Sequence, residues 1–200
     1  MRTLALAALL LVPSLAHAAD AEQPGEKSVA LFDGKTLDGW KVEKCEVEVR
    51  DGCIFLKAGN GWMHTEKQYG DFVLELEWKA LKTEAFDSGV YVRAEERPER
   101  ANWPARNQIN LRQDLLGNIK EIKEAVARPE MAKPGEWNQM RVAVIGTTAT
   151  LELNGKPAWK IDGLKRPRGY IGLQCEVPAG GQFLFRNIRI TTATRTAIGS

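Results

Sequence analysis

Strict alternation of apolar and polar residues marks several short segments of this chain. In the segment 72–80 every second side chain is apolar or aromatic, and most of those between are charged. This period of two is that of a β-strand with one buried face. Residues 140–144 and 149–153 repeat the pattern, and Asn154-Gly155 then supplies the residue pair that favours a type I′ hairpin turn. The pattern predicts antiparallel hairpins.

A single all-β domain of two packed sheets accounts for these strands. No segment before residue 114 has a convincing helical period, so the crossover helices that parallel sheets require are missing and the sheets should be antiparallel. The stretch 118–127 is ambiguous, because it fits either a short helical segment or part of a long loop, and long loops often form sites. Further strands are expected at 42–49, 53–57, 89–94, 107–113, 158–161, 170–177 and 182–191.

The first eighteen residues have the pattern of a signal peptide. Arg2 is followed by an apolar run over 4–12 and by the small-residue triplet Ala16-His17-Ala18. The run is shorter than the roughly 20 residues that span a bilayer, so we expect no membrane anchor. The expected organisation is a signal peptide at 1–18, a polar leader at 19–28, one sandwich domain at 29–192 and a tail at 193–200. The mature protein should be periplasmic or secreted.

The charge balance argues against a nucleic-acid partner. The chain has 28 basic and 26 acidic residues, and loss of Arg2 with the signal peptide lowers the net charge from +2 to about +1. Runs of like charge are also absent, which argues against an anionic membrane surface.

Three cysteines, Cys45, Cys53 and Cys175, allow at most one internal disulfide and leave one thiol over. A two-residue turn at Asp51-Gly52 pairs position 45 with 58 and puts Cys45 and Cys53 on opposite faces, so a bridge between those two needs a bulge. Two alternatives remain: either all three cysteines are buried free thiols, or two of them form one disulfide. The spacing lacks the pairs of a zinc site, and no cofactor is predicted. The Asp-rich loops at 33–38 and 87 leave a calcium or other divalent-cation site open.

His64 is the only histidine left once His17 is removed, which excludes most familiar catalytic layouts. A multi-histidine metal centre is ruled out, and the G-x-S-x-G, P-loop and dinucleotide motifs are missing. Acid–base chemistry would fall to carboxylates, to His64 or to a base generated on a bound metal. Trp62 and Trp103 stand among loop residues, where aromatic faces can stack on sugar rings, although tryptophans are more often core residues.

An ordered set of motifs resembles the 3-keto-disaccharide hydrolase family. Members are exported bacterial proteins with a concanavalin A-like jelly-roll sandwich of the lectin and glucanase type, and those with assigned activity cleave glycosides oxidised at sugar carbon 3. The resemblance thus implies a small carbohydrate substrate. The motifs are LFDGKTLDGW (31–40), YGDFVLELEW (69–78), DSGVYVR (87–93), GEWNQMRV (135–142), LNG (153–155), GYIGLQ (169–174) and FRNIRI (185–190).

The chain departs from the family at one point. Many members have a Glu-x-Gln pattern in the strand after the serine-glycine motif, and here the matching residues are Arg106-Asn107-Gln108. The glutamine is retained and the acid is lost. Either Asp114 or Glu121, the nearest carboxylates in the following loop, replaces it, or this chain is a non-catalytic relative.

The leading hypothesis is an enzyme that cleaves 3-keto-glycosides by proton abstraction at C2, elimination of the anomeric group and hydration. The alternatives are a non-catalytic, lectin-like carbohydrate-binding sandwich and a structural or adhesion domain. A sugar site would lie on the face that Tyr91 and Arg93 share, if Val90 and Val92 face the core. The roles we assign are base and acid for Asp114, Glu121 and His64; enolate or ketone contact for Arg93 and Arg106; and substrate binding for Gln108, Gln113, Trp62, Trp103 and Asp87.

Overall fold

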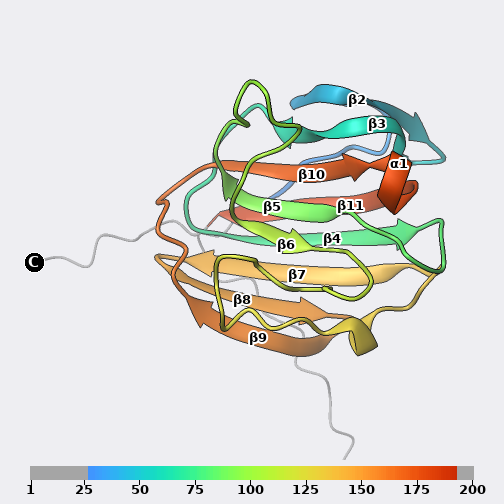
Figure 1. Ribbon diagram of the computed structural model, residues 1–200. Helices are drawn as coiled ribbons and strands as arrows, with labels where there is room; N and C mark the ends of the chain where they lie inside the picture. Colours follow the sequence, from blue (N-terminus) through green and yellow to red (C-terminus); the bar gives the residue numbers. More distant parts are fainter. Residues whose placement is uncertain (1–26, 193–200) are drawn as a thin grey trace, which may run out of the picture.

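The computed structural model describes residues 27–192, in which eleven strands, one α-helical turn and one 3₁₀ turn are found (Figure 1). The predicted signal peptide and C-terminal tail, and most of the leader, lie outside the described residues. The elements in chain order are β1 Lys27–Ala30, β2 Trp40–Arg50, β3 Cys53–Thr65, β4 Phe72–Ala80, β5 Gly89–Ala94, β6 Gln108–Asn110, η1 Pro129–Met131, β7 Asn138–Ile145, β8 Thr148–Leu153, β9 Lys156–Asp162, β10 Tyr170–Glu176, α1 Val177–Gly180 and β11 Phe183–Thr192.

All of the ladders between these strands are antiparallel, and they follow the order β6-β5-β10-β3-β11-β4-β7-β8-β9. Strand β3 joins two sheets, because residues 54–56 pair with β11 and residues 60–64 pair with β10. The hydrogen-bonded path thereby curls into a jelly-roll sandwich, with β5 and β6 in front of β11 and β4 in Figure 1. The all-β antiparallel prediction is confirmed.

One hydrophobic core lies between the two sheets. The alternation over 72–80 is confirmed, since Leu74, Leu76 and Trp78 point inward with at most 3% of their surface exposed. Trp78 packs against Phe86 and Phe183, with ring centroids 6.1 and 6.0 Å apart. Each such residue stabilises the fold by roughly 1.5–3 kcal/mol when fully buried. From the facing sheet, Val90, Val92, Ile171, Leu173 and Cys175 join the same core.

The ambiguous stretch 118–127 is a packed loop without helix. Leu116, Ile119 and Ile122 insert into the core, and the backbone of Asn110 and Asn118 is joined by a 2.9 Å hydrogen bond. The indole nitrogen of Trp159 donates to the Gly117 carbonyl at 2.8 Å. This loop, residues 111–137, is therefore fixed against β6 and can hold polar side chains in place.

Turns and bulges set the register of the strands. Asn154 and Gly155 both have positive φ, which confirms the type I′ turn, and the predicted bulge near Arg186-Asn187 is confirmed by a register shift in β11. The predicted pairing of position 45 with 58 is wrong, because bulges shift β2 so that Cys45 faces Gly59. In the described residues no helix is long and apolar enough to cross a membrane.

Candidate functional site

The side chains that β3, β10, β5 and β6 direct away from the core form a surface that we call the polar face: Trp62, His64, Tyr91, Gln108, Gln174 and Glu176. Because Leu173 and Cys175 of β10 point into the core, Gln174 and Glu176 must point the other way. The register places Gln174 beside Trp62 of β3 and beside Gly89 of β5. Residues more than 100 positions apart in the chain are thereby brought into one row.

A row of amides crosses this face and ends at a carboxylate. Gln108 Nε2 donates to Gln174 Oε1, and Gln174 Nε2 donates to Glu176 Oε2 at 2.8 Å. The row needs glycine at position 89, since a Cβ there would lie 2.1 Å from Gln108 Nε2. Ser88 Oγ donates to the Gln174 carbonyl at 2.7 Å and ties the entrance of β5 to β10. The amides are therefore fixed in position, and the last of them holds the Glu176 carboxyl.

Two carboxyl groups with raised pKa values meet at this end of the polar face. Burial, together with the negative charge of Glu176, raises the pKa of Asp87 to about 6. Burial also raises the pKa of Glu176. Helix turn α1 packs directly on this site, because a Cβ on Gly180 would lie 2.0 Å from the Asp87 carbonyl oxygen. Neighbouring carboxyls whose pKa values are raised to different degrees suit general acid and base roles.

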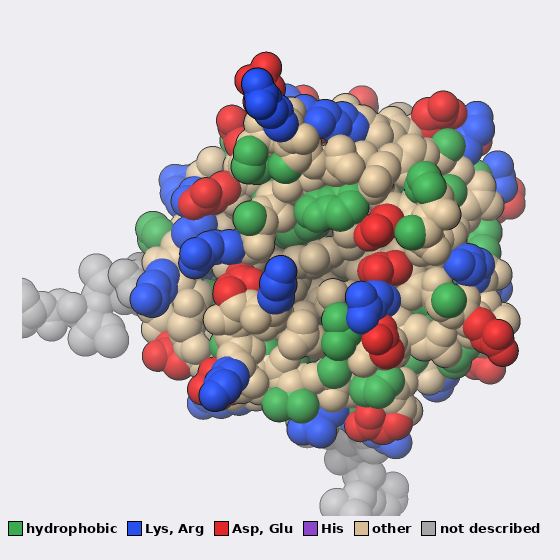
Figure 2. Space-filling model, viewed as in Figure 1, with side chains coloured by type: hydrophobic (Ala, Val, Ile, Leu, Met, Phe, Trp, Pro, Cys, Tyr) green, Lys and Arg blue, Asp and Glu red, His purple; other side chains and the backbone are tan. Residues whose placement is uncertain are grey.

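Asp87 opens into a cavity of about 600 Å³ that we call the acidic cavity, with Arg112, Gln113 and Asp114 on its wall. Arg112 is held by Asp114 through a bidentate pair, with N–O distances of 2.6 and 2.8 Å. Its positive charge lowers the pKa of Asp87 and Glu176 and so opposes the effect of burial. Figure 2 shows acidic and basic side chains gathered beside an exposed apolar patch on this side of the molecule.

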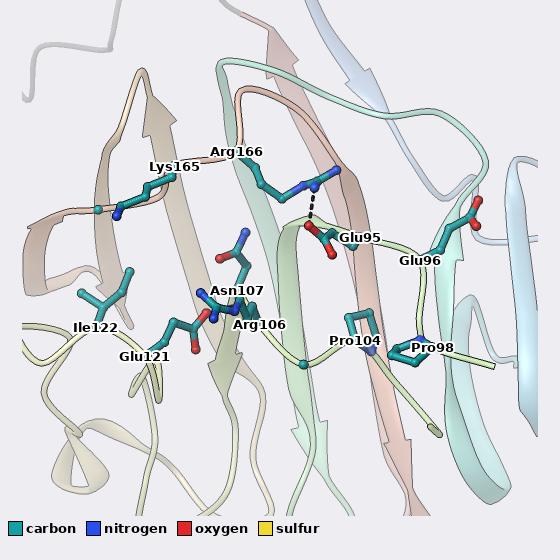
Figure 3. Close-up of a pocket in the computed structure, with 12 residues that line it drawn as sticks. Glu95, Glu96, Pro98, Pro104, Arg106, Asn107, Glu121, Ile122, Lys165 and Arg166 are labelled. Carbon is teal, nitrogen blue, oxygen red and sulfur yellow. Dashed lines mark hydrogen bonds and ion pairs between the residues drawn. The ribbon is translucent and has the colours of Figure 1, made fainter. Parts of the chain in front are cut away.

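A second cavity, of about 400 Å³, lies where β5 ends and β6 begins (Figure 3). We call it the charged cavity. Arg106, Glu121, Lys165 and an ion pair between Glu95 and Arg166 line it. The carboxylate of Glu121 points toward Arg106 in Figure 3 and accepts a hydrogen bond from the Asn107 backbone. The loop 111–137 thus brings a carboxylate beside Arg106.

Trp62 and His64 are buried beneath the loop 95–107, and only 4% of the His64 surface is exposed. Trp62 has no exposed surface and stacks on His64 with ring centroids 4.3 Å apart, and Trp103 of the loop packs on this cluster. His64 lies 3.9 Å from a Glu43 oxygen, but burial lowers the pKa of its imidazole and favours the neutral form. The Tyr91 hydroxyl is also buried here, and it makes no hydrogen bond.

Glu43 and Lys44 of β2 hold this loop in place. Glu43 forms an ion pair with Arg97, and Lys44 Nζ donates to the Ala101 carbonyl at 2.8 Å. The aromatic cluster therefore supports the loop from below, and Trp103 of the loop is only partly buried.

Arg93 does not share the face of Tyr91, and the predicted strand phase is wrong at this residue. Arg93 has φ 48°. Between the pairs Tyr170–Ala94 and Gly172–Tyr91, β10 has one residue and β5 has two, so β5 contains a β-bulge. This bulge turns the guanidinium toward the end of the sandwich, where it is fully buried. It donates to the carbonyls of Gly70 at 2.7 Å and Arg166 at 2.9 Å and pairs with Asp71 at 2.7 Å.

The other predicted residues fall into distinct places. Asp87, Gln113 and Asp114 line the acidic cavity, where Gln113 Oε1 accepts from the Ala85 backbone at 2.6 Å. Gln108 pairs with Tyr91 in the ladder and begins the row of amides. Gln174, Glu176 and Arg112 were missed, and the alternation of β10 was the signal that could have indicated the first two.

No group of three or more His, Cys, Asp and Glu side chains suited to a metal ion is found among residues 27–192. In the Asp-rich loop at 33–38, Asp33 Oδ1 accepts hydrogen bonds from the backbone of Lys35 and Thr36, at 2.7 and 2.8 Å. That carboxylate shapes its own turn.

The fold and site define a jelly-roll sandwich with a polar face that carries carboxylates and amides. The chain belongs to the 3-keto-alpha-glucoside-1,2-lyase-like domain family, whose sequence model matches residues 27–191. A 3-keto-disaccharide hydrolase from Bacteroides thetaiotaomicron is 27% identical over an alignment that covers 58% of this chain and 52% of that protein. The chain therefore spans about half the length of this curated relative.

Solved structures agree on the architecture. A candidate glycosyl hydrolase from Parabacteroides distasonis superimposes with a TM-score of 0.66 at 24% identity, covering 84% of this chain and all of that one. The carbohydrate-binding module CBM66 from Bacillus subtilis superimposes with a TM-score of 0.58 at 13% identity, covering 76% and 94% of the two chains. At these identities the likeness shows the fold alone.

Proposed function

We propose that this chain cleaves 3-keto-glycosides, with Glu176 as the base and Asp87 as the acid of an elimination reaction. Membership of the family supports the substrate class. The single observation that carries the assignment is the pair of neighbouring carboxyls with raised pKa values, one held by an amide and one opening into the acidic cavity.

The ketone at C3 makes the reaction accessible to carboxylates, because it acidifies the proton on C2. Glu176 in its ionised form, held by the hydrogen bond from the Gln174 amide, removes this proton and leaves an enolate on the C3 oxygen. The enolate collapses to a C1=C2 double bond as the C1–O bond breaks. Asp87, protonated below about pH 6, gives its proton to the departing oxygen. Water then adds its hydroxyl to C1 and its proton to C2, which completes hydrolysis.

The neighbouring polar groups suit the remaining tasks. Arg112 bears the positive charge that an enolate oxygen requires, and Asp114 holds it in position. Gln108, fixed on the row of amides, would bind a sugar hydroxyl. The expectation of a periplasmic or secreted location stays with this proposal, because the enzyme would then meet sugars outside the cytoplasm.

The test compares purified wild type with Asp87→Asn and Glu176→Gln on two substrates, a 3-keto-disaccharide and a 4-nitrophenyl 3-keto-glucoside. Glu176→Gln should lose roughly 10²–10⁴-fold in turnover on both. Asp87→Asn should lose a similar factor on the disaccharide and much less on the nitrophenyl substrate, whose leaving group departs without a proton. Asp162→Asn, an exposed aspartate on β9, is the matched control.

Wild-type activity should fall as the pH rises past about 6, because Asp87 then loses the proton that it donates. The Asp87→Asn variant should not show this decrease in activity. Failure of the wild type to convert either keto sugar above background would refute the proposed activity. Binding of unoxidised glycans without turnover would establish the lectin-like alternative instead. Inactivation by Glu121→Gln, with Asp87→Asn fully active, would move the reaction to the charged cavity.

A further inference from the structure

Strand β2 crosses closely over β3 at two glycines. Cys45 pairs with Gly59 in the ladder, and a Cβ on Gly59 would lie 2.7 Å from Cys45 Cα and 3.2 Å from Cys45 Cβ. A Cβ on Gly61 would lie 2.0 Å from the Glu43 carbonyl oxygen. Only the absence of side chains at both positions lets β2 approach β3 so closely, and Cys45 therefore lies directly over the β3 backbone.

Cys175 reaches the same place from the other neighbour of β3. It pairs with Gly61, and its Sγ lies 3.4 Å from the Ala58 carbonyl and 3.9 Å from the Gly59 carbonyl. The two cysteine side chains approach each other over the glycines closely enough that each shifts the pKa of the other. Cys53 is remote from them in the ladder, since it sits at the β2–β3 turn and its Sγ lies 3.6 Å from the Asp51 carbonyl.

The two thiols differ in a way that suits exchange. Cys175 is fully buried, whereas Cys45 is partly accessible. Contact with Cys175 lowers the pKa of Cys45, and the same contact, with burial, raises the pKa of Cys175. The accessible member of the pair is therefore also the one with more thiolate character, and the thiolate is the nucleophile in disulfide exchange.

We propose that Cys45 and Cys175 form an internal disulfide, leaving Cys53 as the single thiol. The oxidant is a second disulfide, either of a small thiol or of an oxidoreductase. The Cys45 thiolate attacks it and expels one thiolate, and Cys175 loses its proton and attacks the Cys45 sulfur, which expels the second. The chain loses two hydrogen atoms, and the oxidant becomes two thiols.

The bridge would fasten together two strands that carry the site. On β2, Glu43 and Lys44 hold the loop 95–107, and on β10, Gln174 and Glu176 belong to the polar face. The link joins positions 45 and 175 and so closes most of the domain into one covalent loop. A loop of that length constrains the unfolded chain strongly.

The experiment treats the full chain with oxidised glutathione, alkylates it in denaturant with iodoacetamide and measures intact mass and peptide map. The oxidised protein should carry one label, on Cys53, and the dithiothreitol-treated protein three. The melting temperature of the oxidised protein should be roughly 5–15 °C above that of the dithiothreitol-treated protein. Cys53→Ser should keep the shift, and the double variant Cys45→Ser/Cys175→Ser should lose it.

Three labels after oxidation, a bridge that includes Cys53, or glutathione retained on Cys45 would each overturn the proposal. Because the readouts are mass and melting temperature, the result is independent of whether the chain cleaves keto sugars. Cys53→Ser leaves the pair intact, so it keeps the test decisive even where the double variant folds poorly.

Discussion

Replacing Arg93 by alanine should unfold this domain much more readily, because the guanidinium holds one end of the sandwich together. Its nitrogens donate to the carbonyls of Gly70, Gly146 and Arg166 and pair with Asp71. Removing one partner of a buried ion pair costs about 3–5 kcal/mol, and each carbonyl left dry adds about 1 kcal/mol or more unless water enters the space. If water enters and satisfies most of the three carbonyls, the total loss should be roughly 4–6 kcal/mol.

Urea unfolding and thermal melting measure this loss. For a domain of this size each kcal/mol lowers the melting temperature by about 2–4 °C, so Arg93→Ala should melt roughly 10–20 °C below the wild type. Arg141→Ala is the matched control, because Arg141 is 42% exposed and contacts Glu75 and Glu152 only at 3.6 and 3.5 Å. Such exposed pairs contribute less than about 1 kcal/mol.

The reasoning is refuted if Arg93→Ala melts like Arg141→Ala. Lost activity in a protein of unchanged stability would return Arg93 to the substrate site that the strand phase indicated. Asp71→Asn tests the same ion pair from the other side. It leaves the buried Arg93 guanidinium without its charged partner Asp71, so it should also destabilise the protein.

Two further predictions concern the acidic cavity. Asp87→Asn should stabilise the protein by about 1–2 kcal/mol above pH 6 and by little at pH 4. Because the pKa of Asp87 is raised in the folded state, the wild type loses stability as the pH rises from about 4 to 6. Asparagine does not ionise, so the variant does not lose this stability. Equal urea midpoints for wild type and variant at pH 7.5 would contradict it. Gly180→Ala should lower both activity and melting temperature, because its Cβ would overlap the Asp87 carbonyl; an unchanged crystal structure at Asp87 would disprove this.

The sequence predicted elements whose signal is local. The alternation over 72–80 reports one buried face, and Asn154-Gly155 reports the positive φ values of a hairpin turn, so neither needs knowledge of the rest of the chain. The bulge at Asn187 is also visible locally as a break in the alternation. At Arg93 the same reasoning failed, because the bulge there depends on how β10 pairs with β5, and nothing in residues 89–94 announces it.

The candidate site was predicted in part for a similar reason. Asp87, Gln113 and Asp114 lie within one stretch of chain and do line one cavity. Glu176, about ninety residues after Asp87 in the sequence, comes near enough to raise the pKa of Asp87 only through the pairing of β10 with β5. The positions of His64 and Trp62 could not be foreseen, since the loop 95–107 covers them through contacts with β2.

The two ends of β5 hold ionisable residues in opposite circumstances, and this difference separates structure from function. Arg93 is fully buried with its charge matched by Asp71 and by carbonyl oxygens, so every change to it should weaken the fold. Asp87 lies beside the like-charged Glu176 in a desolvated position that raises its pKa, so at neutral pH its ionisation opposes folding. An arrangement that lowers stability is maintained where chemistry requires it. If a variant of Asp87 is more stable and less active, and a variant of Arg93 is only less stable, the reaction takes place near Asp87 and Glu176, where β10 ends.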